Sequence, residues 1–132
     1  MTAFFKSLID QDKEPIVICD LTHTVRYMNP SAVERYQKWG GEALVGRSLY
    51  ACHNADSCAK IDRVIRWFSE ATTNNRVHTT YVKSENTDVY MVALRDGDGT
   101  LIGYYEKHEV RTPDPSGWYE NTGLSTPDST VG

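Results

Sequence analysis

The feature that most constrains the fold of this chain is the order of its strand-like runs, two early and three late. The early pair, PIVICD at 15–20 and the alternating segment 25–28, is joined by a short polar turn typical of a β-hairpin. The late runs at 76–84, 87–95 and 100–110 are rich in β-branched and aromatic residues. This order predicts a five-stranded antiparallel sheet with helices gathered on one face, an α+β fold.

A helix start follows the early hairpin directly. Asn29 is a good capping residue, and Pro30 is the residue best suited to the first helical turn. The pair Gly40-Gly41 ends the helical pattern, because glycine adopts the left-handed conformation that closes many helices. We therefore expect a short helix between these two signals.

A connector and a longer helix complete the central region. Segment 42–50 predicts a single helical turn and a connector in which Gly46 frees the backbone. Segment 57–72 has apolar residues along one face and charged residues on the other, which predicts an amphipathic helix. Three residues are candidates for its cap: Asn54, Asp56 and Ser57.

The ends of the chain differ from its centre. Residues 1–13 contain apolar side chains at helical spacing and predict a short amphipathic helix before the main domain, 14–111. The dipeptide repeat at 96–99, DGDG, is a strong hairpin signal between the last two strands. Residues 112–132 are rich in proline and polar residues and predict a mostly disordered tail.

Charge and cysteine content exclude several classes of protein. The net charge of -4, without a basic segment, argues against nucleic-acid binding. Three irregularly spaced cysteines do not make a secreted disulfide scaffold, and no apolar run reaches the length of a signal peptide or membrane span. We expect a cytoplasmic protein that contacts neither nucleic acid nor membrane. No catalytic motif is present, and an enzyme is not expected.

Several stretches in order resemble a PAS domain. They are PIVICD, VRYMNPSAVERY, LVGRSLYACH and DGDGTLIGYYEKHEV, and the resemblance covers about residues 14–111. The stretch GRSLYACHNADSCAKIDRVIRWF is similar to bacterial and archaeal PAS domains that carry a Cys-His pair before the long helix. The resemblance implies a stand-alone sensory module with a cavity for a small molecule. Pro113 and Pro115 oppose a continuing helix, so we expect a signalling partner in trans or a homodimer.

The same resemblance implies which residues serve the cavity. Eight residues are candidates for ligand binding: Ile18, Tyr36, Leu49, His53, Ile61, Ile65, Met91 and Tyr105. A structural role is expected for three others, Asn29, Gly46 and Gly103. Glu106 and Glu109, by contrast, are expected on a solvated face of the last strand.

Three alternatives stay open beside the ligand-binding interpretation. The first is a ligand-free dimerisation module that uses the outer face of the sheet together with Phe4 and Phe5. The second is a haem sensor with His53 as the iron ligand, although haem-binding relatives place their histidine within the long helix. The third is a metal or redox site of His53 with Cys52 or Cys58, which lacks a recognisable fourth ligand. A flavin is not expected, because the Asn-Cys-Arg-Phe-Leu-Gln stretch of flavin-binding relatives is absent.

Overall fold

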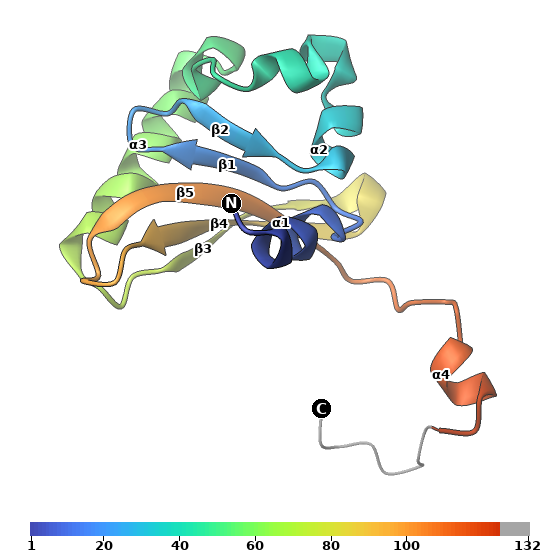
Figure 1. The fold of residues 1–132 in the computed structure, drawn as a ribbon. Helices are drawn as coiled ribbons and strands as arrows, with labels where there is room; N and C mark the ends of the chain where they lie inside the picture. The colour runs from blue at the N-terminus through green and yellow to red at the C-terminus, as the bar shows by residue number, and fades with distance from the viewer. Residues whose placement is uncertain (125–132) are drawn as a thin grey trace.

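A computed structural model describes residues 1–124 and shows the predicted antiparallel sheet (Figure 1). The strands follow the spatial order β2-β1-β5-β4-β3, so the two early strands flank one side of the last strand and the other late strands flank its other side. The α+β fold class is confirmed. The strands are β1 (Val17–Asp20), β2 (Val25–Met28), β3 (Arg76–Val82), β4 (Thr87–Arg95) and β5 (Leu101–Val110).

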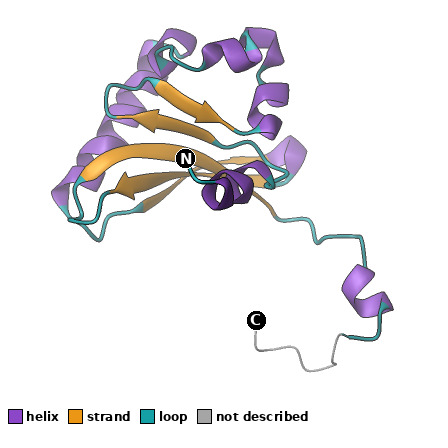
Figure 2. Cartoon of the chain, viewed as in Figure 1, coloured by secondary structure: helices purple, strands orange, loops and turns teal. Residues whose placement is uncertain are grey.

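The helices between β2 and β3 cover one face of this sheet, which we call the inner face (Figure 2). Helix α1 precedes the sheet and lies on the opposite side, in front of the strands in Figure 1. The α-helices are α1 (Ala3–Asp10), α2 (Pro30–Arg35), α3 (Ala55–Glu70) and α4 (Trp118–Asn121). Short 3₁₀ helices occupy η1 (Gln37–Trp39), η2 (Gly41–Leu44), η3 (Leu49–Cys52) and η4 (Lys83–Glu85).

Local side-chain caps explain where the helices begin and end. Asn29 caps α2 by accepting a hydrogen bond from the backbone N–H of Ala32, and Pro30 occupies the first turn. Asn54 caps α3, so this helix begins at Ala55, two residues before the predicted start. At the other end of α3, the Arg95 guanidinium donates to backbone carbonyls of the last turn and of the loop beyond it, which ties the helix to β4.

The turns between the late strands also have a local cause. The Asp96 carboxylate accepts hydrogen bonds from the backbone N–H groups of Asp98 and Thr100, and Gly99 has a φ of 83°. These contacts form the hairpin between β4 and β5. Between β3 and β4, Asn86 takes the left-handed conformation with a φ of 49°, as asparagine does more readily than most residues.

The side chain of Asn29 connects three elements at the entrance to the sheet. Its Oδ1 accepts a second hydrogen bond from Ile16 N at 2.9 Å, while its Nδ2 donates to Ile9 O at 3.1 Å and Glu14 O at 3.0 Å. The end of α1, the segment before β1 and the start of α2 are therefore joined through one fully buried amide.

The main core lies between the inner face and α3. Phe68 and Ala32 are completely buried there, with Cys19, Val25 and Met91 around them. Burial of this apolar surface supplies the main driving force for folding. One part of the interior, however, is not filled by side chains, and it forms the cavity described below.

The exit from β5 is anchored before the tail begins. The Arg111 guanidinium forms two hydrogen bonds with the Asp88 carboxylate, at 2.7 and 2.8 Å. Asn86 Nδ2 donates to Thr112 Oγ1 at 3.0 Å. Beyond these contacts the chain runs to α4, which lies away from the sheet in Figure 1. The remainder of the predicted tail, residues 125–132, lies outside the described residues.

Candidate functional site

A cavity of about 230 Å³ lies between the inner face of the sheet and the helical segment from α2 to α3. Its volume is far larger than the roughly 10–15 Å³ that a single water needs. All strands except β3 contribute to its wall, and so do the end of α2, the 3₁₀ helices η1, η2 and η3, and α3. The lining residues are Val17, Cys19, Val25, Met28, Tyr36, Trp39, Leu44, Ser48, Leu49, His53, Ile61, Met91, Tyr104 and Glu106.

Five of the predicted ligand-binding residues are brought together in this wall. They come from segments far apart in the chain: Tyr36, Leu49, His53, Ile61 and Met91. His53 stands at the end of η3 and is exposed, while its Nδ1 lies 2.8 Å from Leu49 O. The histidine therefore occupies the side of the cavity that meets solvent.

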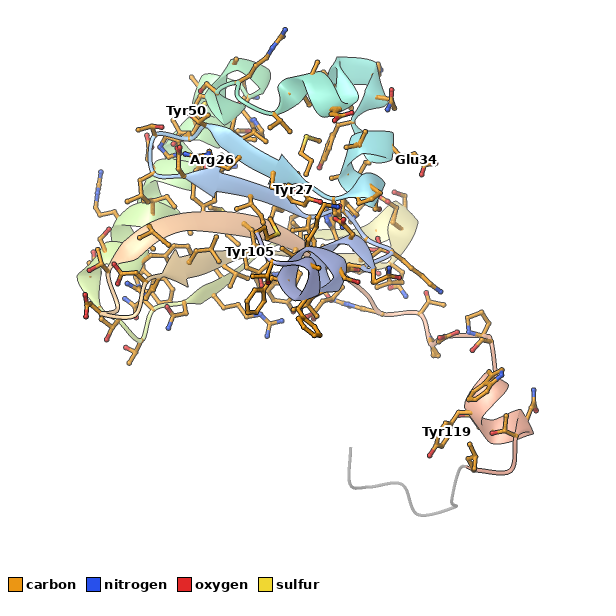
Figure 3. The ribbon with its side chains drawn as sticks, in the orientation of Figure 1. Arg26, Tyr27, Glu34, Tyr50, Tyr105 and Tyr119 are labelled. Atoms are coloured by element: carbon orange, nitrogen blue, oxygen red, sulfur yellow. The ribbon has the colours of Figure 1, made fainter. Side chains whose placement is uncertain are left out.

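Three predicted residues do not line the cavity. Ile18 and Tyr105 are register partners on β1 and β5, and both lie on the face opposite the one predicted (Figure 3 shows Tyr105 on the α1 side). Side chains alternate between the faces of a strand, so an assignment displaced by one residue inverts the face. Ile65 packs against the core, but one helical turn beyond Ile61, the α3 residue in the cavity wall.

The residues that replace them on the inner face are Cys19 and Tyr104, which are also register partners. Burial raises the pKa of the Cys19 thiol to about 11. Burial, followed by the neighbouring Cys19, raises the pKa of the Tyr104 hydroxyl above its ordinary value. Both groups are therefore protonated at neutral pH and offer hydrogen-bond donors, while the neutral thiol is a poor nucleophile.

His23, which the sequence did not single out, fixes the Tyr104 side chain. Its Nδ1 lies 2.9 Å from the Tyr104 hydroxyl, and its ring stacks on Tyr50 with a centroid distance of 4.0 Å. Its Nε2 lies 3.7 Å from the Asp62 carboxylate of α3. His23 has a φ of 65°, a left-handed conformation that is uncommon for residues other than glycine. The sequence carries no signal for this role of His23, because Tyr104 lies 81 positions away in the chain.

Glu106 was expected on a solvated face of the last strand; its side chain is 40% exposed, but it faces the cavity. It lies on the inner face of β5 and lines the cavity, whereas Glu109 lies beside Arg76 and Lys107. Burial, with the Glu106 carboxylate as the next cause, raises the pKa of Tyr36 to about 12. Counting alternate residues forward from Tyr104 would have placed Glu106 on the inner face, had the facing of Tyr104 been known.

In the described part of the Cys-His segment, the His53 ring and the Cys58 thiol contact backbone carbonyls. The Cys58 thiol makes long contacts with Tyr50 O and His53 O, both at 3.9 Å. The side chain of Cys52 lies outside the part of the chain that the structure describes, so the site of His53 with cysteine stays a prediction.

Comparison with protein families agrees with this architecture. The PAS fold family matches residues 9–112, most of the chain. The chain belongs to the PAS family, and the resemblance seen in its sequence is confirmed. No curated protein matches the sequence. Within residues 1–124, no helix is both long and apolar enough to cross a membrane.

Solved structures with the same fold are similar at low identity. A C-terminal domain from Streptococcus mutans has 20% identity and a TM-score of 0.65, covering 89% of this chain and 87% of that one. VqmA from Vibrio cholerae, solved as a complex with a ligand and DNA, has 21% identity and a TM-score of 0.56, covering 96% and 61%. The dual PAS-heme oxygen sensor Aer2 of Vibrio cholerae has 15% identity and a TM-score of 0.52, covering 74% and 94%. At these identities the likeness shows the fold alone.

Proposed function

We propose that this PAS domain is a sensory module, not an enzyme, that binds a small molecule in its cavity and signals through a partner or through self-association. The observation that carries the proposal is the cavity of about 230 Å³ beside the well-packed core. Interiors normally contain few voids larger than a water molecule, and an unfilled cavity lowers stability. A bound ligand would restore the missing contacts.

The composition of the wall suits a small organic molecule. Most lining residues are apolar or aromatic, and a few polar groups stand among them at different points of the wall: Ser48, His53, Tyr104 and Glu106. This combination is typical of ligand sites, where apolar contacts supply affinity and a few hydrogen bonds set orientation. VqmA, which shares the fold, was solved with a ligand and supports the comparison.

Filling the cavity with a larger side chain should abolish ligand binding. Leu49 is half-buried in η3 and lines the cavity, so Leu49→Trp would occupy the ligand volume. At 100 times its Kd, a ligand stabilises the native state by about 2.7 kcal/mol. For a domain of this size, that free energy corresponds to a rise in Tm of roughly 10 °C. A thermal-shift screen with a fragment library measures this rise in the wild type and its loss in the variant.

The matched control is Leu21→Trp, which makes the same change in the turn between β1 and β2, outside the cavity wall. It should retain the ligand-induced rise. The proposal fails if no compound stabilises the wild type and native mass spectrometry shows no retained ligand. A visible absorption spectrum tests the haem alternative, since a Soret band would favour His53 as an iron ligand.

A second candidate function is homodimerisation through α1, favoured by its exposed apolar side chains. Phe4 is 89% exposed and Leu8 is 74% exposed, and no residue of the helix is buried. Exposed apolar patches of this kind often mark sites of association. We therefore expect Phe4→Glu combined with Leu8→Glu to shift the protein toward monomer in sedimentation velocity. Ser7→Glu, on the same helix, should leave the distribution unchanged, and a dimer that persists in the double variant contradicts this role.

A further inference from the structure

Glu106 lies in the middle of the inner face and lines the cavity. A carboxylate that loses its water there needs another partner. The strand of Glu106, β5, is the central strand of the sheet, and the register partners of Glu106 are Val17 on β1 and Met91 on β4. Both partners are apolar and line the same cavity. The Glu106 side chain is 40% exposed, so water from the open side of the cavity solvates its carboxylate. A ligand that displaces this water leaves a charge among apolar groups, which costs several kcal/mol unless the ligand itself supplies a partner.

Two polar side chains of the protein approach this carboxylate, and neither is a lysine or an arginine. One is Tyr36, whose pKa is raised by burial and then by Glu106, and the other is His108. His108, which is buried two residues further along β5, places Nε2 3.7 Å from Glu106 Oε1, beyond normal hydrogen-bond length. Its Nδ1 lies 3.3 Å from Pro15 O, which suits an Nδ1–H donor. In the neutral tautomer with the proton on Nδ1, Nε2 carries no hydrogen and offers the carboxylate no donor.

The contrast with Glu109 on the same strand is informative. Glu109 lies 3.2 Å from Arg76 and 3.1 Å from Lys107, so basic side chains neutralise it. Arg35 precedes Tyr36 in the sequence but does not line the cavity. Its guanidinium donates hydrogen bonds of 2.7 and 3.0 Å to the Glu85 carboxylate. Among the described lining residues there is no lysine or arginine, and Glu106 is the one that is acidic.

The aromatic residues of the wall have the same preference for positive charge. Tyr36 and Trp39 both line the cavity, with ring centroids 6.1 Å apart in a tilted arrangement. The faces of such rings attract cations, most strongly where water is excluded. The Trp39 ring already has a cationic partner, because Lys38 Nζ lies 5.5 Å from its centroid. Glu106 and the Tyr36 ring, in a mostly apolar wall, therefore form a site that suits a ligand cation.

We propose that the ligand of this cavity is a small apolar molecule that carries a protonated nitrogen, and that Glu106 is the residue that selects this head group. The inference rests on the proposed function, since it names the class of ligand that the cavity binds. The protonated nitrogen donates a hydrogen bond to the Glu106 carboxylate, and the apolar body lies among residues such as Val17 and Met91. Anionic ligands are disfavoured, because the described wall presents them with a carboxylate and with no lysine or arginine.

Three compounds with one skeleton and different head groups test this inference. They are 2-phenylethylamine, 2-phenylethanol and phenylacetate, which are cationic, neutral and anionic at pH 7. Calorimetric titration of the wild type should show the amine binding at least about tenfold more tightly than the alcohol, because hydrogen bonds to charged groups are the stronger ones. Phenylacetate should bind more weakly than either. Glu106→Gln should reduce the preference for the amine to about twofold or less, because loss of the charge weakens binding of the amine more than binding of the alcohol.

Glu109→Gln is the control, since it makes the same substitution on the same strand outside the cavity wall. It should retain the full preference for the amine. Equal or tighter binding of the alcohol or the acid by the wild type overturns the assignment of the head group, and the proposed function survives. The same assignment is overturned if Glu106→Gln keeps the preference.

A second series, hexylamine, hexanol and hexanoate, separates a wrong skeleton from a wrong head group. If neither amine binds while other fragments stabilise the wild type, the inference is overturned and the proposed function stands. If no compound of any kind binds, both are overturned. The comparison among compounds uses the wild-type protein, so it holds even if Glu106→Gln does not fold.

Discussion

Replacing Asn29 by alanine should lower the free energy of unfolding by about 3–4 kcal/mol, the sum of a lost helix cap and of buried backbone groups left without partners. The side chain has 0% exposure. Its loss removes the acceptor of Ala32 N and Ile16 N and the donor to Ile9 O and Glu14 O. Ile9 O keeps a hydrogen bond from Asp12 N at 3.4 Å, but Ile16 N and Ala32 N are buried and lose their acceptor, so each adds its desolvation cost.

Urea unfolding followed by circular dichroism measures this loss. The matched control is Asn54→Ala, which removes the cap of α3, where an exposed Oδ1 accepts one hydrogen bond from Ser57 N at 2.8 Å. A cap alone contributes about 1 kcal/mol. Equal losses in the two variants would show that the additional hydrogen bonds of Asn29 contribute nothing to stability.

Replacing Gly103 by alanine should destabilise the protein by roughly 2–4 kcal/mol, because a side chain would collide with the backbone of the neighbouring strand. A Cβ atom at this position would lie 2.4 Å from Cys19 O. Gly103 pairs with Asp20 in the β1–β5 ladder, so the collision can be relieved only if these strands separate. The strand separation would also displace Cys19 and Tyr104 from the cavity wall.

The control for this prediction is Gly97→Ala in the hairpin between β4 and β5. A Cβ atom there meets nothing within 4 Å, and the φ of Gly97 lies outside the left-handed region. The Tm of this variant should change by no more than a few degrees. A Gly103→Ala protein as stable as the Gly97→Ala protein would mean that β1 and β5 can separate at little cost.

Much of the fold could be predicted because its signals are local. The Asn29-Pro30 pair starts α2, and the Asp96–Gly99 turn joins β4 and β5 through contacts within five residues. Such signals depend on backbone geometry and on the immediate neighbours of a residue. The cap of α3 was one of three candidates, because Asn54, Asp56 and Ser57 all have suitable side chains and only the folded chain selects one.

The cavity could be predicted only in part, because its wall depends on which face of each strand turns inward. Tyr36 at the end of α2, Leu49 in η3 and Ile61 in α3 were placed correctly by the resemblance to PAS domains. The strands were harder, because β1 has apolar residues at successive positions, so that either Ile18 or its neighbours Val17 and Cys19 could face the helices. His23 was missed because its role depends on Tyr104, 81 positions away.

The sequence by itself therefore determined the elements of this PAS domain, their order and most of their ends, since propensities, caps and turns act over a few residues. Only the tertiary structure decided the facing of the strands. A period of two shows which residues share a face, but it does not show which face meets the helices. In the folded protein, the register partners Cys19 and Tyr104 face the helices. Glu106, two residues beyond Tyr104, therefore lies in the wall of the cavity.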